Sequence, residues 1–284
     1  MSTYAEVIGD PVAQSKSPAL HQFWLDEAGL AGAAYRRQRV SAEDLPRYFA
    51  ARRGDPAWRG CNVTMPHKQA VLDLVDRLDP AAAAIGAVNT IVPQDNSLVG
   101  YNTDAEGFLE PLRAELAKRH LFRMARVLGT GGAARAIVSA LARQGFVIVL
   151  AGRDPQKARA LLDEFVPGDD HHAVAISHFA APTEFAFDDR AGCLDLVVNA
   201  SPLGMRGQPP LPFDWSHAPP GAIAYDIVTD PVETSFLAGA RAKGFPIIDG
   251  LSMLIGQAAL AFEYFYGMPA PRARDTELRQ LLAR

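Results

Sequence analysis

Short apolar runs alternate with longer amphipathic stretches along most of the chain. In the first part, strands are predicted at residues 4–8, 34–40, 88–92 and 98–101 and in a run that ends at Val63. Helices are predicted over residues 18–28 and 45–51. The polar sequence Gln94-Asp95-Asn96 between the last two strands predicts a hairpin. This alternation is typical of an α/β domain with a mostly parallel sheet.

The alternation continues in a second part, which follows an amphipathic helix predicted over residues 108–116. Its strands are predicted at residues 125–128, 146–151, 194–199, 222–227 and 246–248. Its helices are predicted over residues 136–143, after Pro155, over the strongly apolar residues 251–265 and over residues 276–283. The proline-rich residues 201–220 are predicted to form an ordered loop.

Residues 167–190 are the least regular part of the pattern. They contain the adjacent His171 and His172, whose side chains point apart and which no cysteine or carboxylate frame surrounds. We therefore interpret this segment as a solvated loop and predict no metal site.

Residues 61–68, Cys-Asn-Val-Thr-Met-Pro-His-Lys, predict the end of a buried strand, a polar turn and the first turn of a helix. That helix would continue with an apolar face made by Ala70, Val71, Leu74, Val75 and Leu78. Lys68 is notable because a cation is mildly unfavourable at a helix N-terminus. It is either a solvated surface lysine or a lysine held where ligands bind, with its ammonium made easier to deprotonate.

Length and composition limit the class of protein. A chain of 284 residues favours two domains, and its apolar and charged fractions are those of a globular protein. The net charge of −4 gives no support for nucleic acid or an acidic membrane as a partner. No apolar run approaches the roughly 20 residues that span a bilayer, and we find no signal peptide. With Cys61 and Cys193 interpreted as reduced thiols, we expect a cytoplasmic protein.

The sequence Gly129-Thr130-Gly131-Gly132-Ala133-Ala134 stands between a predicted strand and a predicted helix. Gly129 permits a tight turn, and Gly131 allows the backbone to approach a pyrophosphate at the helix N-terminus. Ala133 or Ala134 takes the place of a third glycine and allows close helix packing. A second strand follows at the expected spacing, so we predict a dinucleotide-binding loop.

The end of that second strand bears on the choice of cofactor. About 20 residues after the loop, where an enzyme that selects NAD carries a carboxylate, stand Ala151 and Gly152. Arg153 and Lys157 follow and suit a 2′-phosphate. Asp154 could repel that phosphate or accept from the ribose hydroxyls, or it could only cap the helix that begins at Pro155.

Several polar residues suit a small acid that carries several hydroxyl groups. Asp104, Ser15 and Ser17 each precede or begin a predicted helix, where capping is the default explanation. Asn89 and Gln257 interrupt apolar segments, where a buried amide needs a partner. Together with Lys68, the serines could hold a carboxylate and the amides could hold hydroxyls.

These motifs give the chain a resemblance to the shikimate dehydrogenase family, the shikimate/quinate dehydrogenases. The matching segments cover nearly the whole chain in order. They are residues 9–21 with Ser-Lys-Ser-Pro, residues 62–68, 87–90 and 100–107, the Gly129 loop, and residues 249–254 with Gln257-Ala258. The resemblance implies a substrate-binding domain over residues 1–103, completed by residues 250–284, and a Rossmann-type NADP-binding domain over residues 104–249.

The resemblance also implies the activity and the roles of residues. The reaction is the NADPH-dependent, reversible reduction of 3-dehydroshikimate to shikimate, a step of aromatic amino-acid biosynthesis. Lys68 and Asp104 would form the catalytic pair, with Ser15 and Ser17 on the substrate carboxylate and Thr64, Asn89 and Gln257 at the ring hydroxyls. The cofactor would meet Gly129, Thr130, Gly131, Gly132, Ala133, Arg153, Asp154, Lys157, Ile227 and Gly250.

Two departures from the family pattern leave alternatives open. Gly152-Arg153-Asp154 replaces Asn-Arg-Thr, so use of NAD, alone or beside NADP, is an alternative. Thr229 replaces a tyrosine, so oxidation of quinate is a second alternative. A nucleotide-sensing module without turnover is a third, disfavoured because a sensor needs no proton-transfer pair. The composition fits a monomer or a homodimer.

Overall fold

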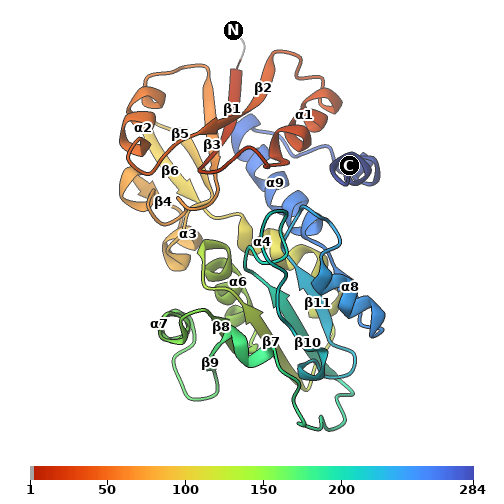
Figure 1. Cartoon of the computed structure of the whole chain (residues 1–284). Helices are drawn as coiled ribbons and strands as arrows, with labels where there is room; N and C mark the ends of the chain where they lie inside the picture. Colours follow the sequence, from red (N-terminus) through yellow and green to blue (C-terminus); the bar gives the residue numbers. More distant parts are fainter. Residues whose placement is uncertain (1–2) are drawn as a thin grey trace. The chain divides into compact units, whose positions relative to one another are not determined.

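The computed structural model describes residues 3–284 and divides into two compact units (Figure 1). The first unit comprises the chain up to Gly107 together with Ile255–Arg284, and the second comprises Phe108–Leu254. The chain passes between the units inside helix α4 (Asp104–Leu109) and again inside helix α9 (Gly250–Tyr266). The first unit is therefore built from both ends of the chain.

The first unit contains a six-stranded sheet of order β2-β1-β3-β5-β6-β4. Its strands are β1 (Thr3–Gly9), β2 (Ala33–Arg39), β3 (Trp58–Val63), β4 (Arg77–Leu78), β5 (Thr90–Gln94) and β6 (Ser97–Tyr101). β1 pairs in parallel with β2 and β3, whereas β5 is antiparallel to both β3 and β6. The predicted α/β class is confirmed for this unit.

Helices cover both faces of this sheet (Figure 1). They are α1 (Ser17–Glu27), α2 (Leu45–Arg53), α3 (Pro80–Ile85), α9 and α10 (Asp275–Leu282), with 3-10 turns at Leu72–Leu74 and Arg272–Arg274. On the α2 side the buried core contains Ile8, Leu45, Phe49, Cys61, Val63 and Ile91. On the opposite side, aromatic side chains of α1 and α9 pack on Tyr35 of β2.

The hairpin between β5 and β6 is as predicted. Asp95 and Asn96 at its tip have φ values of 50° and 62°. A two-residue turn of this kind requires positive φ at both positions, which Asp and Asn tolerate better than most residues.

The helix predicted after Pro66 is wrong. Residues 65–71 form turns, followed by the short 3-10 turn and by β4. The backbone oxygen of Lys68, which an α-helix would pair with residue 72, accepts instead from the N–H of Val88 at 2.8 Å. Val71 still reaches the core, but Ala70 and Leu78 of the predicted apolar face are exposed.

The second unit contains an all-parallel sheet of order β12-β11-β10-β7-β8-β9. Its strands are β7 (Phe122–Leu128), β8 (Val147–Gly152), β9 (His172–Ala175), β10 (Cys193–Asn199), β11 (Ile223–Asp226) and β12 (Ile247–Ile248). β9 lies within the segment interpreted as a solvated loop, so that interpretation is wrong at residues 172–175. Pairing with β8, which periodicity does not reveal, makes this short stretch an edge strand.

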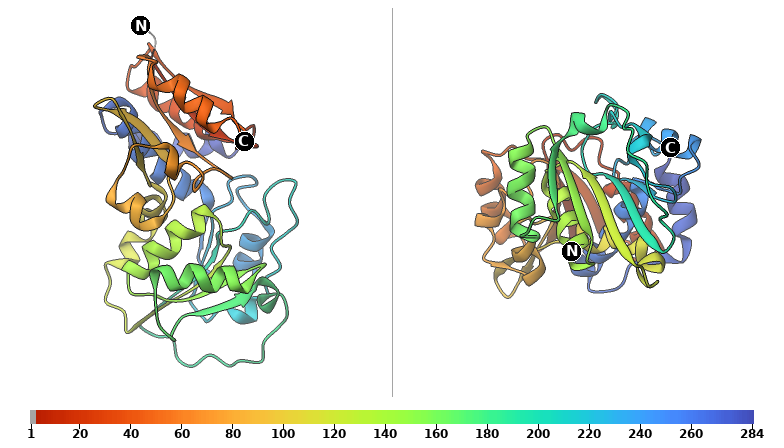
Figure 2. Two further views of the ribbon diagram at one scale, coloured as in Figure 1. Left: turned by 90° about the vertical axis from the view of Figure 1, so that its left-hand side faces the viewer. Right: turned by 90° about the horizontal axis from the view of Figure 1, so that it is seen from below.

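Helices α6 (Gly132–Arg143) and α7 (Pro155–Phe165) lie side by side over one face of this sheet (Figure 2). Helix α8 (Ser235–Ala242) packs on the other face through Phe236, Leu237 and Ala240. Short 3-10 turns lie at Ile176–Phe179 and Trp215–His217. The helix predicted over residues 108–116 is divided into the end of α4, a 3-10 turn (Glu110–Leu112) and α5 (Arg113–Leu116). Pro111 lies at the break, as expected of a residue that cannot continue helical hydrogen bonding.

Among residues 3–284, no helix combines the length and apolar character needed to cross a membrane. Both cysteines are free thiols, Cys61 fully buried and Cys193 partly exposed. Burial raises the pKa of the Cys61 thiol above its ordinary range.

Candidate active site

The first unit brings together Lys68 and Asp104, which are distant in the sequence. Lys68 lies in the turns after β3, and Asp104 begins α4. The Lys68 ammonium donates to Asp104 Oδ2 at 2.5 Å, and the two side chains are only 14% and 5% exposed. The interpretation of Lys68 as a solvated surface lysine is therefore wrong. A nearly buried ion pair is costly unless further hydrogen bonds satisfy it, and such residues occur at functional sites.

Asn89 supplies one of those hydrogen bonds. Its side-chain Nδ2 donates to Asp104 Oδ1 and to Thr103 Oγ1, both at 2.9 Å, and its side-chain Oδ1 accepts from the Thr103 N–H at 2.8 Å. Gln257 Oε1 lies 3.5 Å from the same amide. The two amides predicted from interrupted apolar runs thus lie beside the ion pair. Thr103 was missed, although it stands inside the Asn-Thr-Asp motif.

Glycine allows the two helices at the site to approach closely. A Cβ added to Gly107 of α4 would lie 2.5 Å from the backbone nitrogen of Gln257 on α9. Any larger residue would push Gln257 away from Asn89 and Thr103. The C-terminal part of the chain therefore contributes Gln257 to the surroundings of the Lys68–Asp104 pair.

The predicted serine loop and Thr64 lie at the ends of β1 and β3. Ser15 Oγ accepts from the Ser17 N–H at 3.3 Å, whereas Lys16, the residue at the N-cap of α1, supplies no side-chain cap. Arg37 of β2, which the sequence did not single out, donates from Nε and Nη2 to the Ser15 carbonyl oxygen at 3.0 and 2.6 Å. A Cβ on Gly9 would meet Thr64 Cγ2 at 2.5 Å, so β1 packs directly against Thr64. Both the side chain and the backbone oxygen of Ser15 are therefore engaged in hydrogen bonds of this loop.

In the second unit, the glycine loop joins β7 to α6. Gly129 has φ +130°, and a Cβ there would lie 2.5 Å from the carbonyl oxygen of Ala200. A Cβ on Gly131 would meet nothing within 4 Å, and Gly131 provides no side-chain cap for α6. The first turn of this helix therefore keeps N–H groups available to an anion. The loop, from Gly129 through Thr130, Gly131 and Gly132 to Ala133, thus leaves open space at the N-terminus of α6.

Asp154 is the N-cap of α7, and its Oδ1 accepts from the Gln156 N–H at 2.9 Å. The capping interpretation of this residue is confirmed. Arg153 and Lys157 beside it are exposed. One acidic and two basic side chains therefore lie close together in the chain after β8.

Ile227 and Gly250 lie next to each other beyond the end of β11. In the sheet, β11 and the strand before the glycine loop, β7, flank β10. A Cβ on Gly250 would be 2.2 Å from the carbonyl oxygen of Val228, so the start of α9 touches the segment after β11. The fully buried carboxyl group of Asp226 orders that segment by accepting from Asn199 Nδ2, the Val228 N–H and Thr234 Oγ1 at 3.0, 2.9 and 2.6 Å. Burial outweighs these bonds and raises the pKa of Asp226 to about 6.

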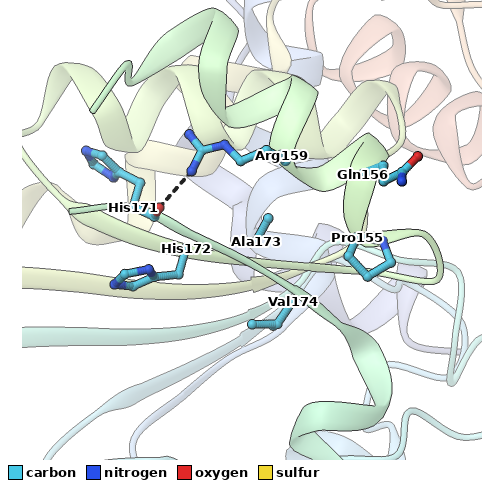
Figure 3. A pocket seen from close by; sticks show the side chains of 7 residues that line it. All are labelled: Pro155, Gln156, Arg159, His171, His172, Ala173 and Val174. Atoms are coloured by element: carbon cyan, nitrogen blue, oxygen red, sulfur yellow. Dashed lines mark hydrogen bonds between the residues drawn. The ribbon is translucent and has the colours of Figure 1, made fainter. Parts of the chain in front are cut away.

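A hollow of about 520 Å³ lies beside α7 and β9 (Figure 3). It is lined by Pro155, Gln156, Arg159, His171, His172, Ala173 and Val174. Arg159 donates to the His171 carbonyl oxygen at 2.9 Å, and His171 Nδ1 accepts from the Ile148 N–H at 3.1 Å. Burial lowers the pKa of His171, which favours the neutral ring. Among residues 3–284, no three His, Cys, Asp or Glu side chains gather in a way that could hold a metal ion.

Two family models match the chain. The shikimate dehydrogenase substrate binding domain matches residues 7–91, and the shikimate 5′-dehydrogenase C-terminal domain matches residues 250–277. The site built by Lys68, Asn89 and Asp104 thus lies within or just after the first matched segment, and Gln257 lies in the second.

Full-length relatives match as well. The NADP⁺ shikimate dehydrogenase of Sphingopyxis alaskensis is 53% identical over 99% of this chain and 97% of its own. The structure of shikimate 5-dehydrogenase from Thermus thermophilus with NADP(H) and shikimate has a TM-score of 0.82, at 36% identity over 99% of both chains. The structure of shikimate 5-dehydrogenase from Listeria monocytogenes with shikimate and NAD has a TM-score of 0.77, at 26% identity over 98% of this chain and 96% of that one.

Proposed function

The chain belongs to the shikimate dehydrogenase family, and from this membership we propose that it catalyses the reversible, NADP-dependent reduction of 3-dehydroshikimate to shikimate. The observation that carries the proposal is the nearly buried Lys68–Asp104 pair, surrounded by amide and hydroxyl groups. A cyclic acid with several hydroxyl groups offers partners to each of these groups. Binding of such a substrate also accounts for the presence of two charged side chains, Lys68 and Asp104, at a nearly buried position.

We assign Lys68 to the oxygen that changes between ketone and alcohol. As this oxygen gains negative charge, an ammonium group in a poorly solvated site stabilises it and donates the proton that completes the alcohol. Asp104 holds the ammonium group in position and accepts from a substrate hydroxyl. In the direction of oxidation, Lys68 takes the same proton back.

The other site residues of the first unit bind and orient the substrate. Asn89, Thr64 and Gln257 present amide and hydroxyl groups to the ring hydroxyls. Ser15 and Ser17 donate to the carboxylate, with Arg37 holding the Ser15 carbonyl and adding positive potential nearby. We propose on this basis that the first unit binds the substrate.

We propose that the second unit binds the cofactor, which supplies the hydride when it is bound. The loop from Gly129 to Ala133 would hold the pyrophosphate at the N-terminus of α6. Arg153 and Lys157 would bind the 2′-phosphate, and Ile227 and Gly250 would contact the nicotinamide end. NADP is the cofactor named for curated relatives of the family.

NAD use beside NADP is a second candidate, supported by the charge of Asp154 next to Arg153. The Listeria structure in complex with NAD indicates that this fold can accept the unphosphorylated cofactor. Oxidation of quinate is a related candidate, supported by Thr229, which replaces a larger family residue. Neither alternative changes the roles proposed for Lys68 and Asp104.

One kinetic experiment tests the proposal. Initial rates are measured at the nicotinamide absorbance band with shikimate and quinate, each with NADP⁺ and NAD⁺. The highest kcat/KM is expected for shikimate with NADP⁺. A higher value for quinate or NAD⁺ would replace the first proposal with one of the alternatives. Absence of turnover with all four pairs, despite ligand binding, would favour the sensing module.

The free thiols are consistent with a reducing compartment, and we propose that the protein works in the cytoplasm. We propose a monomer or a homodimer in solution, which light scattering on the purified protein distinguishes.

A further inference from the structure

A continuous chain of buried hydrogen bonds leads from Tyr35, on β2, to the Lys68–Asp104 pair. The Tyr35 hydroxyl donates to Asn62 Oδ1 at 2.5 Å, and Asn62 Nδ2 donates to Thr90 Oγ1 at 3.0 Å. The Thr90 hydroxyl donates to Asn89 Oδ1 at 3.1 Å. The Asn89 amide then donates to Asp104 Oδ1 at 2.9 Å.

All four bonds have the same direction. Each group accepts from the Tyr35 side and donates toward Asp104, where a carboxylate, which only accepts, ends the chain. Hydrogen bonds aligned in this way polarise one another and strengthen in a poorly solvated interior. Burial raises the pKa of Tyr35 well above its usual value, so its hydroxyl stays a donor.

Tyr35 is one of the groups that fix the orientation of the Asn62 amide. An amide can turn by 180° and exchange its oxygen and nitrogen, unless its partners distinguish the two ends. The Tyr35 hydroxyl occupies the oxygen end, while the Asn89 carbonyl oxygen and Thr90 Oγ1 accept from the nitrogen end at 3.2 and 3.0 Å. At the oxygen end of Asn89, the Thr90 hydroxyl donates to Oδ1 beside the backbone N–H of Thr103, which donates to the same oxygen at 2.8 Å.

The fold holds Tyr35 firmly at the start of this chain. Strand β1 lies between β2 and β3, and the residue of β1 that pairs with Tyr35 is Ala5, which is small enough for the ring to cross. His21 stacks on the ring at a centroid distance of 4.0 Å and an interplanar angle of 1°. A buried ring that is stacked in this way has little freedom to leave Asn62.

We propose that Tyr35 and Thr90 are positioning residues for the reaction, which act through Asn62 and Asn89 to hold the Asp104 carboxylate toward Lys68. Neither Tyr35 nor Thr90 contacts the substrate in this proposal. This inference rests on the proposed function, because its main readout is turnover. It predicts that loss of either hydroxyl group lowers kcat and leaves KM for shikimate largely unchanged.

The test compares isosteric variants of the full chain. Tyr35→Phe and Thr90→Val are each expected to lower kcat about fivefold, the effect of one hydrogen bond on a barrier. Thr90→Ser keeps the hydroxyl and is expected to retain wild-type kcat. Tyr48→Phe is the matched control, since Tyr48 is equally buried on the other face of the sheet and donates to Glu6 at 2.6 Å, outside the chain of bonds.

A second readout does not depend on turnover. The side-chain amide resonances of Asn62 and Asn89, followed by ¹⁵N NMR, are expected to shift in Tyr35→Phe and to stay in place in Tyr48→Phe. Wild-type protein without turnover would overturn the proposed function, while these resonances still test the chain of bonds.

Two results would overturn the inference. One is a Tyr35→Phe protein with wild-type kcat and unshifted amides. The other is an equal loss of kcat in Tyr48→Phe or Thr90→Ser, which would indicate a general effect of a weakened core. If Tyr35→Phe does not fold, the Thr90→Val and Thr90→Ser pair decides by itself.

Discussion

Lys68 is the residue on which the proposed chemistry depends most directly. Lys68→Met keeps an unbranched chain of similar size and removes the ammonium group. We expect kcat to fall by about 10²–10⁴-fold with a much smaller change in KM, because the charge acts mainly in the transition state. Steady-state kinetics with shikimate and NADP⁺ measure both constants.

Lys118→Met is a suitable control, since Lys118 is an exposed lysine that pairs only with Glu115 among its described ionic partners. It should leave both constants unchanged. A Lys68→Met enzyme with near-normal kcat would remove Lys68 from the mechanism.

Two functions of Asp154 can be separated by two substitutions. Asp154→Asn keeps an oxygen that can cap α7 and removes the charge beside Arg153, so kcat/KM with NADP⁺ should rise about two- to fivefold. Asp154→Ala also removes the cap and should lower the free energy of unfolding by about 1 kcal/mol. Kinetics with both cofactors and denaturant unfolding measure these effects. A fall in kcat/KM with NADP⁺ for Asp154→Asn would contradict the proposed repulsion.

His21 makes the free energy of unfolding depend on pH. It is fully buried, and burial lowers its pKa from 6.5 to about 3. Between these values the unfolded chain binds a proton at this residue that the folded chain does not, so stability falls as the pH falls. The contribution is about 1.4 kcal/mol per pH unit across this window.

His21→Phe removes the titrating group and keeps an aromatic ring beside Tyr35. Its plot of unfolding free energy against pH should therefore be less steep than the wild-type plot between pH 6 and 4 by about that amount. Denaturant titrations at several pH values measure the slopes, and equal slopes would show that His21 is protonated in the folded protein.

At the scale of residues, some site residues were recognisable from the sequence because they break a local pattern. Asn89 and Gln257 could be found because amides interrupt apolar runs, and Lys68 because a cation stood at a predicted helix start. Tyr35 could not be found in this way, since a tyrosine in a predicted strand needs no special explanation. Its partner Asn62 lies two strands away in the sheet, and strand order does not follow from periodicity.

At the scale of elements, Gly129 and Gly131 have different roles at the junction of β7 and α6. Gly129 is required by the backbone conformation, whereas Gly131 leaves space at the start of the helix. Gly129→Ala introduces a Cβ at φ +130° and against Ala200, so we expect the free energy of unfolding to fall by about 2–4 kcal/mol. Gly131→Ala meets no atom within 4 Å and has φ −83°, so stability should change by less than about 0.5 kcal/mol.

Cofactor binding should be affected by Gly131→Ala, the substitution that is expected to change stability least. A methyl group on Gly131 would occupy space proposed for the pyrophosphate, and KM for NADP⁺ should rise at least about tenfold in this stable variant. Thermal unfolding and cofactor titration measure both properties. An unchanged KM in Gly131→Ala would argue against pyrophosphate binding at this loop.

Most elements with regular periodicity were predicted well, and two of the errors have a common cause. The helix expected after Pro66 failed because Val88 takes the Lys68 carbonyl, and β9 was missed because its partner β8 lies more than 20 residues earlier. Both outcomes depend on hydrogen bonds between distant residues. A local pattern of apolar positions cannot report such bonds.

At the scale of the whole molecule, the chain crosses between its two units twice, and this connectivity decides which segments share a site. Gln257, near the end of the chain, reaches Asn89 because residues 255–284 return to the first unit. The last helix is tied to the serine loop in the same unit, where Lys16 donates to the Leu282 carbonyl oxygen. A site of this kind can be proposed from motifs, but its completion by the C-terminal residues follows only from the fold.

We propose that the first unit binds the substrate and the second binds the cofactor. This assignment predicts two separate patterns of protection from hydrogen exchange. A bound ligand stabilises the local structure that it contacts, so amide exchange there slows. Shikimate alone should protect peptides that contain residues 62–68, 102–107 and 255–260, in the first unit. NADP⁺ alone should protect residues 128–135 and 152–158, in the second. Mass spectrometry of the full chain with each ligand measures both patterns, with Gly131→Ala as the variant that loses only the second. If shikimate alone slowed amide exchange in the Gly129 loop and left residues 62–68 unaffected, the substrate would bind to the second unit, contrary to the proposal.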